Sequence, residues 1–133
     1  MHDKLIIRTD GGARGNPGPA AIGVVIENEW GEEIKTISQY LGEATNNQAE
    51  YQAIYQGLKA AKAMGASRLD CYLDSELVVK QLNKEYKVKD PDLKVLYNQI
   101  LDLAIFKNIS FKHVRREQNK LADKLVNEAL DEA

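Results

Sequence analysis

Short apolar runs bounded by turn residues occupy the first third of the chain, and they predict β-strands. The runs cover residues 4–10, 21–28 and 34–41, and each contains β-branched residues. The first separator, residues 11–19, holds four glycines and two prolines, and the second is a polar turn around Gly31. Three strands joined in this way predict an antiparallel meander.

The apolar pattern changes to helical spacing after this meander. Alanine, isoleucine and leucine recur three or four positions apart, which predicts a helix over residues 47–64. Thr45 and Asn46 are candidate N-caps of this helix, and Gly65 is a candidate C-cap.

The rest of the chain is expected to alternate between strands and helices. The expected elements are a strand over 68–73, a helix from Ser75 to about Asn83, a helix from Pro91 to about Phe106, a strand over 109–114 and a helix over 119–132. A meander followed by this alternation predicts an α/β fold, in which helices flank a mixed five-stranded sheet with antiparallel and parallel strands. We expect residues 1–133 to form a single domain.

Composition excludes several classes of protein. Hydrophobic residues make up 44% of the chain, which is ordinary for one buried core. The single cysteine, Cys71, excludes an internal disulfide and a cysteine-rich zinc site, and we expect it in the core. No apolar run approaches the roughly 20 residues of a membrane span, and the N-terminal run is too short for a signal peptide. We therefore expect a cytoplasmic protein.

Four carboxylates occupy positions that an ordinary fold would avoid. Asp10 and Asp74 are predicted at the carboxyl ends of strands, where ligands of open α/β sheets bind. Helical spacing places Glu50 and Asp123 on the apolar faces of their helices. Carboxylates turned toward a core are unfavourable unless they are paired or bound to metal.

A metal site explains this pattern better than ion pairing does. Arg8 is the obvious cation near Asp10, and one arginine cannot neutralise four carboxylates. Ligand sets made only of oxygen favour Mg²⁺ or Mn²⁺. Two such ions close together are the usual device of phosphoryl transfer.

Each carboxylate also has an ordinary structural explanation. Asp74 could cap a helix, Asp123 could interact favourably with the helix dipole, Glu50 could complete a capping box with Asn47, and Asp10 could be a turn residue. Their predicted convergence at one end of the sheet favours the shared metal site. Asp70, which lies in the middle of a strand, is interpreted as a structural or surface residue.

Four ordered motifs give the chain a family resemblance. The segments Thr9–Gly12 and Gly15–Gly18 resemble the opening of ribonuclease HI enzymes, and Thr45–Glu50 resembles their second motif. Asp74–Ser75 resembles the third motif, and Asn119 with Ala122–Asp123 resembles the fourth. The resemblance extends from residue 4 to residue 130, and four motifs in order are highly specific.

The resemblance implies a ribonuclease H-like fold and an endonuclease that cuts the RNA strand of RNA–DNA hybrids. It implies a catalytic centre in which Asp10, Glu50, Asp74 and Asp123 hold two divalent ions. The ions would be Mg²⁺, with Mn²⁺ as a substitute. The products would carry 5′-phosphate and 3′-hydroxyl ends, and the enzyme would be a monomer. By the same resemblance, the hybrid would be contacted by Gly12, Asn16, Thr45, Asn46, Asn47 and Asn119. His113 or Arg116 would assist catalysis.

The chain departs from the family pattern after the third motif. Many members carry a basic protrusion rich in tryptophan and lysine there, whereas residues 76–95 are short and contain lysines but no tryptophan. Trp30 lies in a predicted turn, so Tyr86 is the candidate replacement for the aromatic surface. Glu43 stands where an arginine often holds a DNA phosphate. The chain resembles a compact branch without the protrusion, and we expect weaker hybrid binding.

The net charge of −2 is unusual for a nucleic-acid binder. Setting aside four metal-bound carboxylates changes that charge to about +2, and basic residues surround Asp123 in the sequence. A weakly active or inactive nucleic-acid-binding module remains the alternative function. Exonucleases and integrases of the same superfold also remain, although their motif spacings differ from those of this chain.

Overall fold

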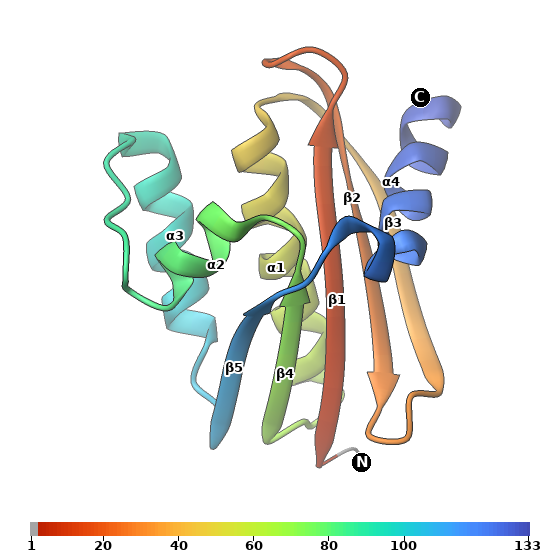
Figure 1. The fold of residues 1–133 in the computed structure, drawn as a ribbon, viewed down its shortest axis with the longest axis vertical. Coiled ribbons are helices and arrows are strands. Elements are labelled where there is room, and N and C mark those ends of the chain that lie inside the picture. Colours follow the sequence, from red (N-terminus) through yellow and green to blue (C-terminus); the bar gives the residue numbers. More distant parts are fainter. Residues whose placement is uncertain (1–2) are drawn as a thin grey trace.

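The structure, a computed structural model, describes residues 3–133 and contains a five-stranded sheet with four α-helices (Figure 1). The elements are β1 (Lys4–Ala13), β2 (Gly18–Asn28), β3 (Glu33–Ala44), α1 (Asn46–Ala63), β4 (Arg68–Leu73), α2 (Glu76–Leu82), α3 (Pro91–Leu103), β5 (Asn108–His113), a 3-10 turn (Arg116–Gln118) and α4 (Lys120–Glu132). The strand order is β3-β2-β1-β4-β5. The first three strands are antiparallel, and β4 and β5 are parallel to β1, which confirms the predicted mixed sheet.

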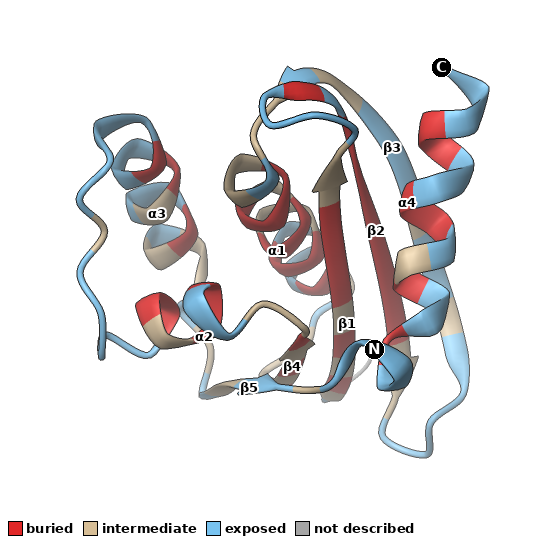
Figure 2. Ribbon diagram, turned by 45° about the horizontal axis from the view of Figure 1, so that its top comes forward, coloured by how far each residue is buried: buried red, intermediate tan, exposed pale blue. Residues whose placement is uncertain are grey.

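Alternation along the strands places α1 and α4 on opposite faces of the sheet (Figures 1 and 2). Gly57 of α1 packs against Ile7 and Val24, whereas Gly23, the neighbour of Val24, packs against α4 at Ala122. The larger core lies between α1 and the sheet, and it includes Cys71 as predicted. None of the helices in residues 3–133 has the length and apolar character needed to cross a membrane.

The β1–β2 hairpin is longer than the sequence predicted. β1 continues through Ala13 and β2 starts at Gly18, so the predicted loop over 11–19 shrinks to residues 14–17. Asp10 consequently lies inside the strand, paired with Gly23, and the prediction that it ends β1 was wrong. Turn propensity misled the prediction, because glycines such as Gly11 can stay in a β-ladder when a second element needs the space.

Helix α3 ends at Leu103, about three residues earlier than predicted. Ala104 terminates the helix, and its N–H donates to the carbonyls of Ile100 and Leu101. The chain then turns so that Phe106 packs against the core, with the Lys62 ammonium 5.7 Å from its ring centroid. This contact requires the backbone to leave the helical path before Phe106.

Strand β3 forms one edge of the sheet and contains two irregularities. Its pairing with β2 shifts between Ala20 and Ala21, and again between Ile26 and Glu27. In both places β3 carries the extra residue, Leu41 at the first shift and Ile34 at the second. Both of these side chains are partly buried against the core.

We predict that Gly23→Ala destabilises the fold, because α4 crosses β2 at this glycine. A Cβ atom at Gly23 would lie 2.1 Å from the carbonyl oxygen of Ala122. Overpacking of this kind costs roughly 1–3 kcal/mol. Urea denaturation measures the loss.

Gly12→Ala is the matched control for this prediction. It also adds a methyl group to a strand, but the nearest heavy atom of Val126 is 3.8 Å away, an ordinary contact. Equal unfolding midpoints for Gly23→Ala and the wild type would show that α4 does not pack at this distance.

Candidate active site

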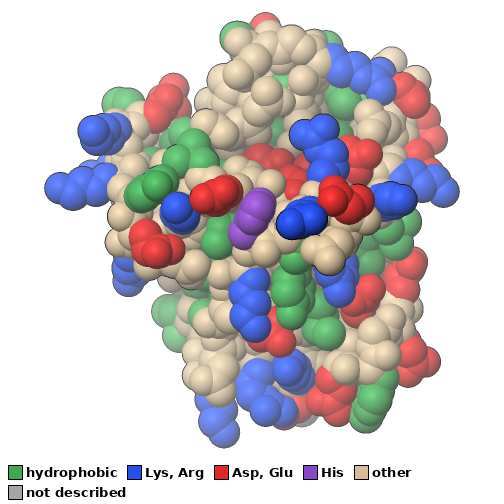
Figure 3. Space-filling view, in the orientation of Figure 1, with side chains coloured by type: hydrophobic (Ala, Val, Ile, Leu, Met, Phe, Trp, Pro, Cys, Tyr) green, Lys and Arg blue, Asp and Glu red, His purple; other side chains and the backbone are tan. Residues whose placement is uncertain are grey.

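A cavity of about 400 Å³ contains all four predicted carboxylates. Asp10 lies on β1, Glu50 on α1, Asp123 on α4, and Asp74 directly follows β4. Because β1 and β4 are parallel neighbours, with Thr9 paired to Leu73, Asp10 and Asp74 emerge at the same level of the sheet. Figure 3 shows acidic side chains in this part of the surface with lysine and arginine side chains around them.

Helix α1 reaches the carboxylates because Gly11 has no side chain. A Cβ atom at Gly11 would lie 2.4 Å from the carbonyl group of Ala49, so the helix backbone rests directly on β1. The Gly11 N–H donates to both Asp10 Oδ1, at 3.0 Å, and Glu50 Oε1, at 3.2 Å. This shared donor fixes the two carboxylates next to each other.

The first turn of α1 leaves Glu50 free to face the cavity. Thr45 is the N-cap, and its side chain forms a capping box with Gln48. The alternative capping box between Glu50 and Asn47 is therefore wrong. Asn46 is the first residue of the helix, and its Oδ1 accepts a hydrogen bond from the Ala13 N–H at 2.8 Å.

The carboxylates repel one another in a poorly solvated space. Asp10 and Glu50 are 8% and 7% exposed, and each offers an oxygen within 4.8 Å of one from Asp74. Burial, together with the negative charges of Asp74 and Asp123, raises the pKa of Asp10 to about 7. Burial and the charges of Asp10 and Asp74 also raise the pKa of Glu50.

No arginine of residues 3–133 forms an ion pair with these carboxylates. Arg8, the candidate partner of Asp10 in the sequence, pairs with Glu27 at 3.3 Å and lies 4.9 Å from the centroid of the Tyr72 ring. Glu50 Oε2 is buried without a hydrogen-bond partner among residues 3–133. A divalent cation with oxygen ligands fits this donor set, and Asp10, Glu50 and Asp74 are the residues that could hold it.

The resemblance predicted that His113 or Arg116 assists catalysis. Arg116 lies in the 3-10 turn and lines the cavity, whereas His113 ends β5 in an exposed position and is outside the lining. Arg14 and Asn127 also line the cavity, and neither was among the residues predicted from the sequence. Arg14 pairs with Asp131 at 2.6 Å, and only the spacing of Asn127 from Asp123, one helical turn, could have indicated its position.

The residues predicted to contact nucleic acid fall into two groups. Gly12, Asn46 and Asn47 line the cavity. The other three make internal contacts: Thr45 caps α1, Asn16 Oδ1 accepts from the Asn46 N–H at 3.0 Å, and Asn119 is 1% exposed with its amide turned inward. Their contacts with nucleic acid stay predictions.

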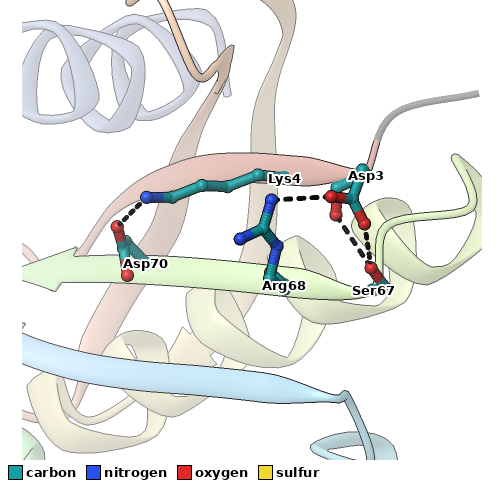
Figure 4. A network of polar contacts seen from close by, with 5 residues as sticks. All are labelled: Asp3, Lys4, Ser67, Arg68 and Asp70. Carbon is teal, nitrogen blue, oxygen red and sulfur yellow. Dashed lines mark hydrogen bonds and ion pairs between the residues drawn. The ribbon is translucent and has the colours of Figure 1, made fainter.

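Asp70 lies outside the cluster, in a separate polar network (Figure 4). Its carboxylate pairs with Lys4 at 3.2 Å and accepts from Ser110 Oγ at 2.9 Å, which confirms its structural interpretation. Trp30 is 77% exposed in the β2–β3 turn. Tyr86 lines a different cavity, of about 490 Å³, together with Lys84, Lys87, Lys89 and Lys94.

The reverse transcriptase-like protein family matches residues 8–129 of the chain. A bifunctional protein of Mycobacterium tuberculosis is 44% identical over 98% of the chain, but the chain covers only 36% of that protein. A ribonuclease H of Syntrophus aciditrophicus is 32% identical over 98% of the chain and 82% of its own length. The chain thus spans about a third of the first relative and most of the second.

Two solved structures share the fold. RNase H1 of the halophilic archaeon Halobacterium salinarum superposes with a TM-score of 0.95 at 41% identity, over 98% of this chain and 99% of that one. LC11-RNase H1, solved in complex with an RNA/DNA hybrid, superposes with a TM-score of 0.92 at 46% identity, over 96% and 97% of the two chains.

We predict that the metal-free protein loses stability as the pH rises from 5 to 8. The Asp10 pKa is about 7 in the folded chain against 3.8 for an ordinary Asp, so the folded state binds more protons than the unfolded state in this range. The free energy of unfolding then falls with rising pH, by roughly 1–3 kcal/mol. Urea denaturation in EDTA at pH 5 and pH 8 measures the slope.

Asp10→Asn should flatten this slope and be more stable than the wild type at pH 8, because it removes a repulsive charge. Asp70→Asn, the control, should keep the wild-type slope. Mg²⁺ at pH 8 should restore stability to the wild type, by about 2.7 kcal/mol at a hundredfold excess over its Kd. Wild-type stability that rises from pH 5 to pH 8 in EDTA would contradict the buried cluster.

Proposed function

Because the chain belongs to the ribonuclease H family, we propose that it is an endonuclease that hydrolyses the RNA strand of RNA–DNA hybrids. The proposed reaction uses two divalent ions and leaves 5′-phosphate and 3′-hydroxyl ends. The observation that carries the proposal is the convergence of Asp10, Glu50 and Asp74, two of them buried, in a family whose members include ribonucleases. The hybrid bound to LC11-RNase H1 supports the choice of substrate.

The carboxylates are proposed to hold the ions, and the scaffold keeps them in place. When bound, divalent ions supply activation of a water nucleophile and stabilisation of charge on the phosphate. The Gly11 N–H orients Asp10 and Glu50 through its two hydrogen bonds. Burial of both groups keeps bulk water away and strengthens their interaction with a cation. The protein then acts mainly by positioning and electrostatic stabilisation.

The cavity edge offers groups that suit the sugar and phosphate of a nucleic acid. The Asn46 side chain uses its oxygen to bind the Ala13 N–H, so its NH₂ group is the end left for a substrate. An amide donor at this position suits a 2′-hydroxyl or a base edge in a shallow minor groove. Gly12 allows close approach of a sugar, and Arg116 supplies a positive charge for a phosphate.

The proposal includes Mg²⁺ as the natural ion with Mn²⁺ as a substitute, and a monomer that acts in the cytoplasm. A ligand set of carboxylates without sulfur or imidazole supports the choice of ion. The buried single thiol of Cys71 is consistent with a reducing compartment. The alternative, an inactive binding module, gives no reason for a mutually repulsive carboxylate cluster.

We predict that Asp10→Asn and Asp74→Asn each abolish cleavage while leaving the protein folded. Both variants remove a proposed ion ligand, and both relieve repulsion in the metal-free state. Labelled RNA–DNA, RNA–RNA and DNA–DNA duplexes are incubated with Mg²⁺, Mn²⁺ or EDTA. The wild type should cut the RNA–DNA duplex and leave the DNA–DNA duplex intact, with no cleavage in EDTA.

Asp70→Asn is the matched control, since it is also an Asp-to-Asn change and lies on β4, the strand that precedes Asp74. It should retain wild-type cleavage, because Asp70 lies in the Lys4 network away from the cavity. Metal-dependent cleavage by Asp10→Asn at the wild-type rate would refute the proposed active site. An inactive wild type that still binds hybrid would favour the binding-module alternative.

A further inference from the structure

Asn119 is a buried polar residue that the proposed chemistry leaves without a task. It sits between the 3-10 turn and α4, and its side chain is 1% exposed. Its Nδ2 donates to the Thr9 carbonyl oxygen at 2.7 Å and to Asp74 Oδ2 at 3.3 Å. Two oxygen acceptors at these distances require the NH₂ end of the amide, so the chemistry of its partners fixes the orientation of the side chain.

Asn119 forms hydrogen bonds with three of the four segments that carry the carboxylates. Thr9 precedes Asp10 on β1, and Asp74 is the residue that follows β4. The Asn119 carbonyl accepts the Asp123 N–H at 3.1 Å, in the first turn of α4. One residue therefore links β1, the Asp74 carboxylate and the start of the helix that presents Asp123.

The side chain forgoes two more usual interactions to make these contacts. Asparagine is among the preferred N-cap residues, yet Asn119 makes no side-chain cap at the start of α4. Its Oδ1 is buried without a hydrogen-bond partner among residues 3–133. A residue that served only to begin the helix would cap it, whereas the Asn119 amide is directed at the Thr9 carbonyl and at the Asp74 carboxylate.

We propose that Asn119 is a positioning residue that orients Asp74 for cation binding, an inference that rests on the proposed function of the carboxylates. Its amide donates to Oδ2 of Asp74 and restrains the carboxylate, which leaves the other oxygen for an ion. The donor is neutral, so it does not compete with a cation as lysine or arginine would. Residues that orient metal ligands in this way strongly influence metal affinity.

Isothermal titration calorimetry with Mn²⁺, in the absence of nucleic acid, tests this inference. Asn119→Leu keeps the branched shape and the number of heavy atoms of the side chain and removes the donor. It should raise the half-saturating Mn²⁺ concentration about 10–100-fold. Asn119→Ala is the second variant, because a smaller side chain fits the same space without steric conflict, and it should shift the concentration in the same direction.

Leu125→Ala is the matched control for lost stability. Leu125 lies on the same helix and packs against Val25 and Ala122, away from the carboxylates, so its truncation weakens α4 docking alone. It should change the half-saturating Mn²⁺ concentration less than about twofold. A shift as large as that of the Asn119 variants would reduce Asn119 to a purely structural residue and overturn the inference.

A double-mutant cycle identifies the route of the effect. If Asn119 acts through Asp74, Asn119→Leu should have less than about a twofold effect on Mn²⁺ binding in an Asp74→Asn background. A full additional loss of Mn²⁺ affinity in that background would overturn the inference.

Cleavage assays separate this inference from the proposed function. An inactive wild type with Asn119-dependent Mn²⁺ binding refutes only the function. An active wild type with unchanged Mn²⁺ binding in both Asn119 variants refutes only the inference.

Discussion

The contact between the backbone of α1 and strand β1 at Gly11 determines the arrangement of the candidate active site. Any larger side chain would separate the helix from the strand, because a Cβ atom there would overlap the carbonyl group of Ala49. The close approach brings Glu50 beside Asp10 in a space that water hardly reaches. The packing of the core around Ile54 and Leu58 then holds the two carboxylates together against their electrostatic repulsion. Binding of the proposed cations would therefore be coupled to folding.

The two helices on opposite faces of the sheet complete the site from separate directions. Helix α1 presents Glu50 from one face, whereas α4 presents Asp123 from the other, and β1 and β4 contribute Asp10 and Asp74 between them. Asp10, Glu50 and Asp123 lie on strands or helices, which hold side chains more rigidly than loops do. Asp74 directly follows the end of β4. The β1–β2 hairpin is connected to the same framework, because its Ala13 N–H is bound by Asn46 of α1.

The sequence predicted the order of the elements, the mixed sheet and the convergence of the carboxylates on one cavity, because periodicity and helix-face spacing depend on local patterns. Three of them, Asp10, Glu50 and Asp74, form the close group. The sequence misplaced Asp10 at a strand end, since the pairing of Gly11 and Gly12 with β2 depends on a helix that lies far along the chain. The sequence did not show that the Asn119 side chain contacts Thr9 and Asp74, and its contact with nucleic acid stays a prediction. An asparagine can cap, bridge or bind ligand, and only the three-dimensional surroundings decide among these. Arg14 and Asn127 were missed because their position in the cavity results from how α4 docks on the hairpin.

The position of β3 at the edge of the sheet affects whether the protein associates with other copies of itself. A twelve-residue strand at the edge of a sheet is a template for pairing with another chain, and such pairing leads to aggregation. The two bulges at Ile34 and Leu41 interrupt the regular spacing of hydrogen-bonding groups along this edge. Charged residues such as Glu33, Lys35 and Glu43 add repulsion and hydration to the same strand. The edge is thereby a poor partner for intermolecular β-pairing, which protects the protein from fibril-like self-association at high concentration.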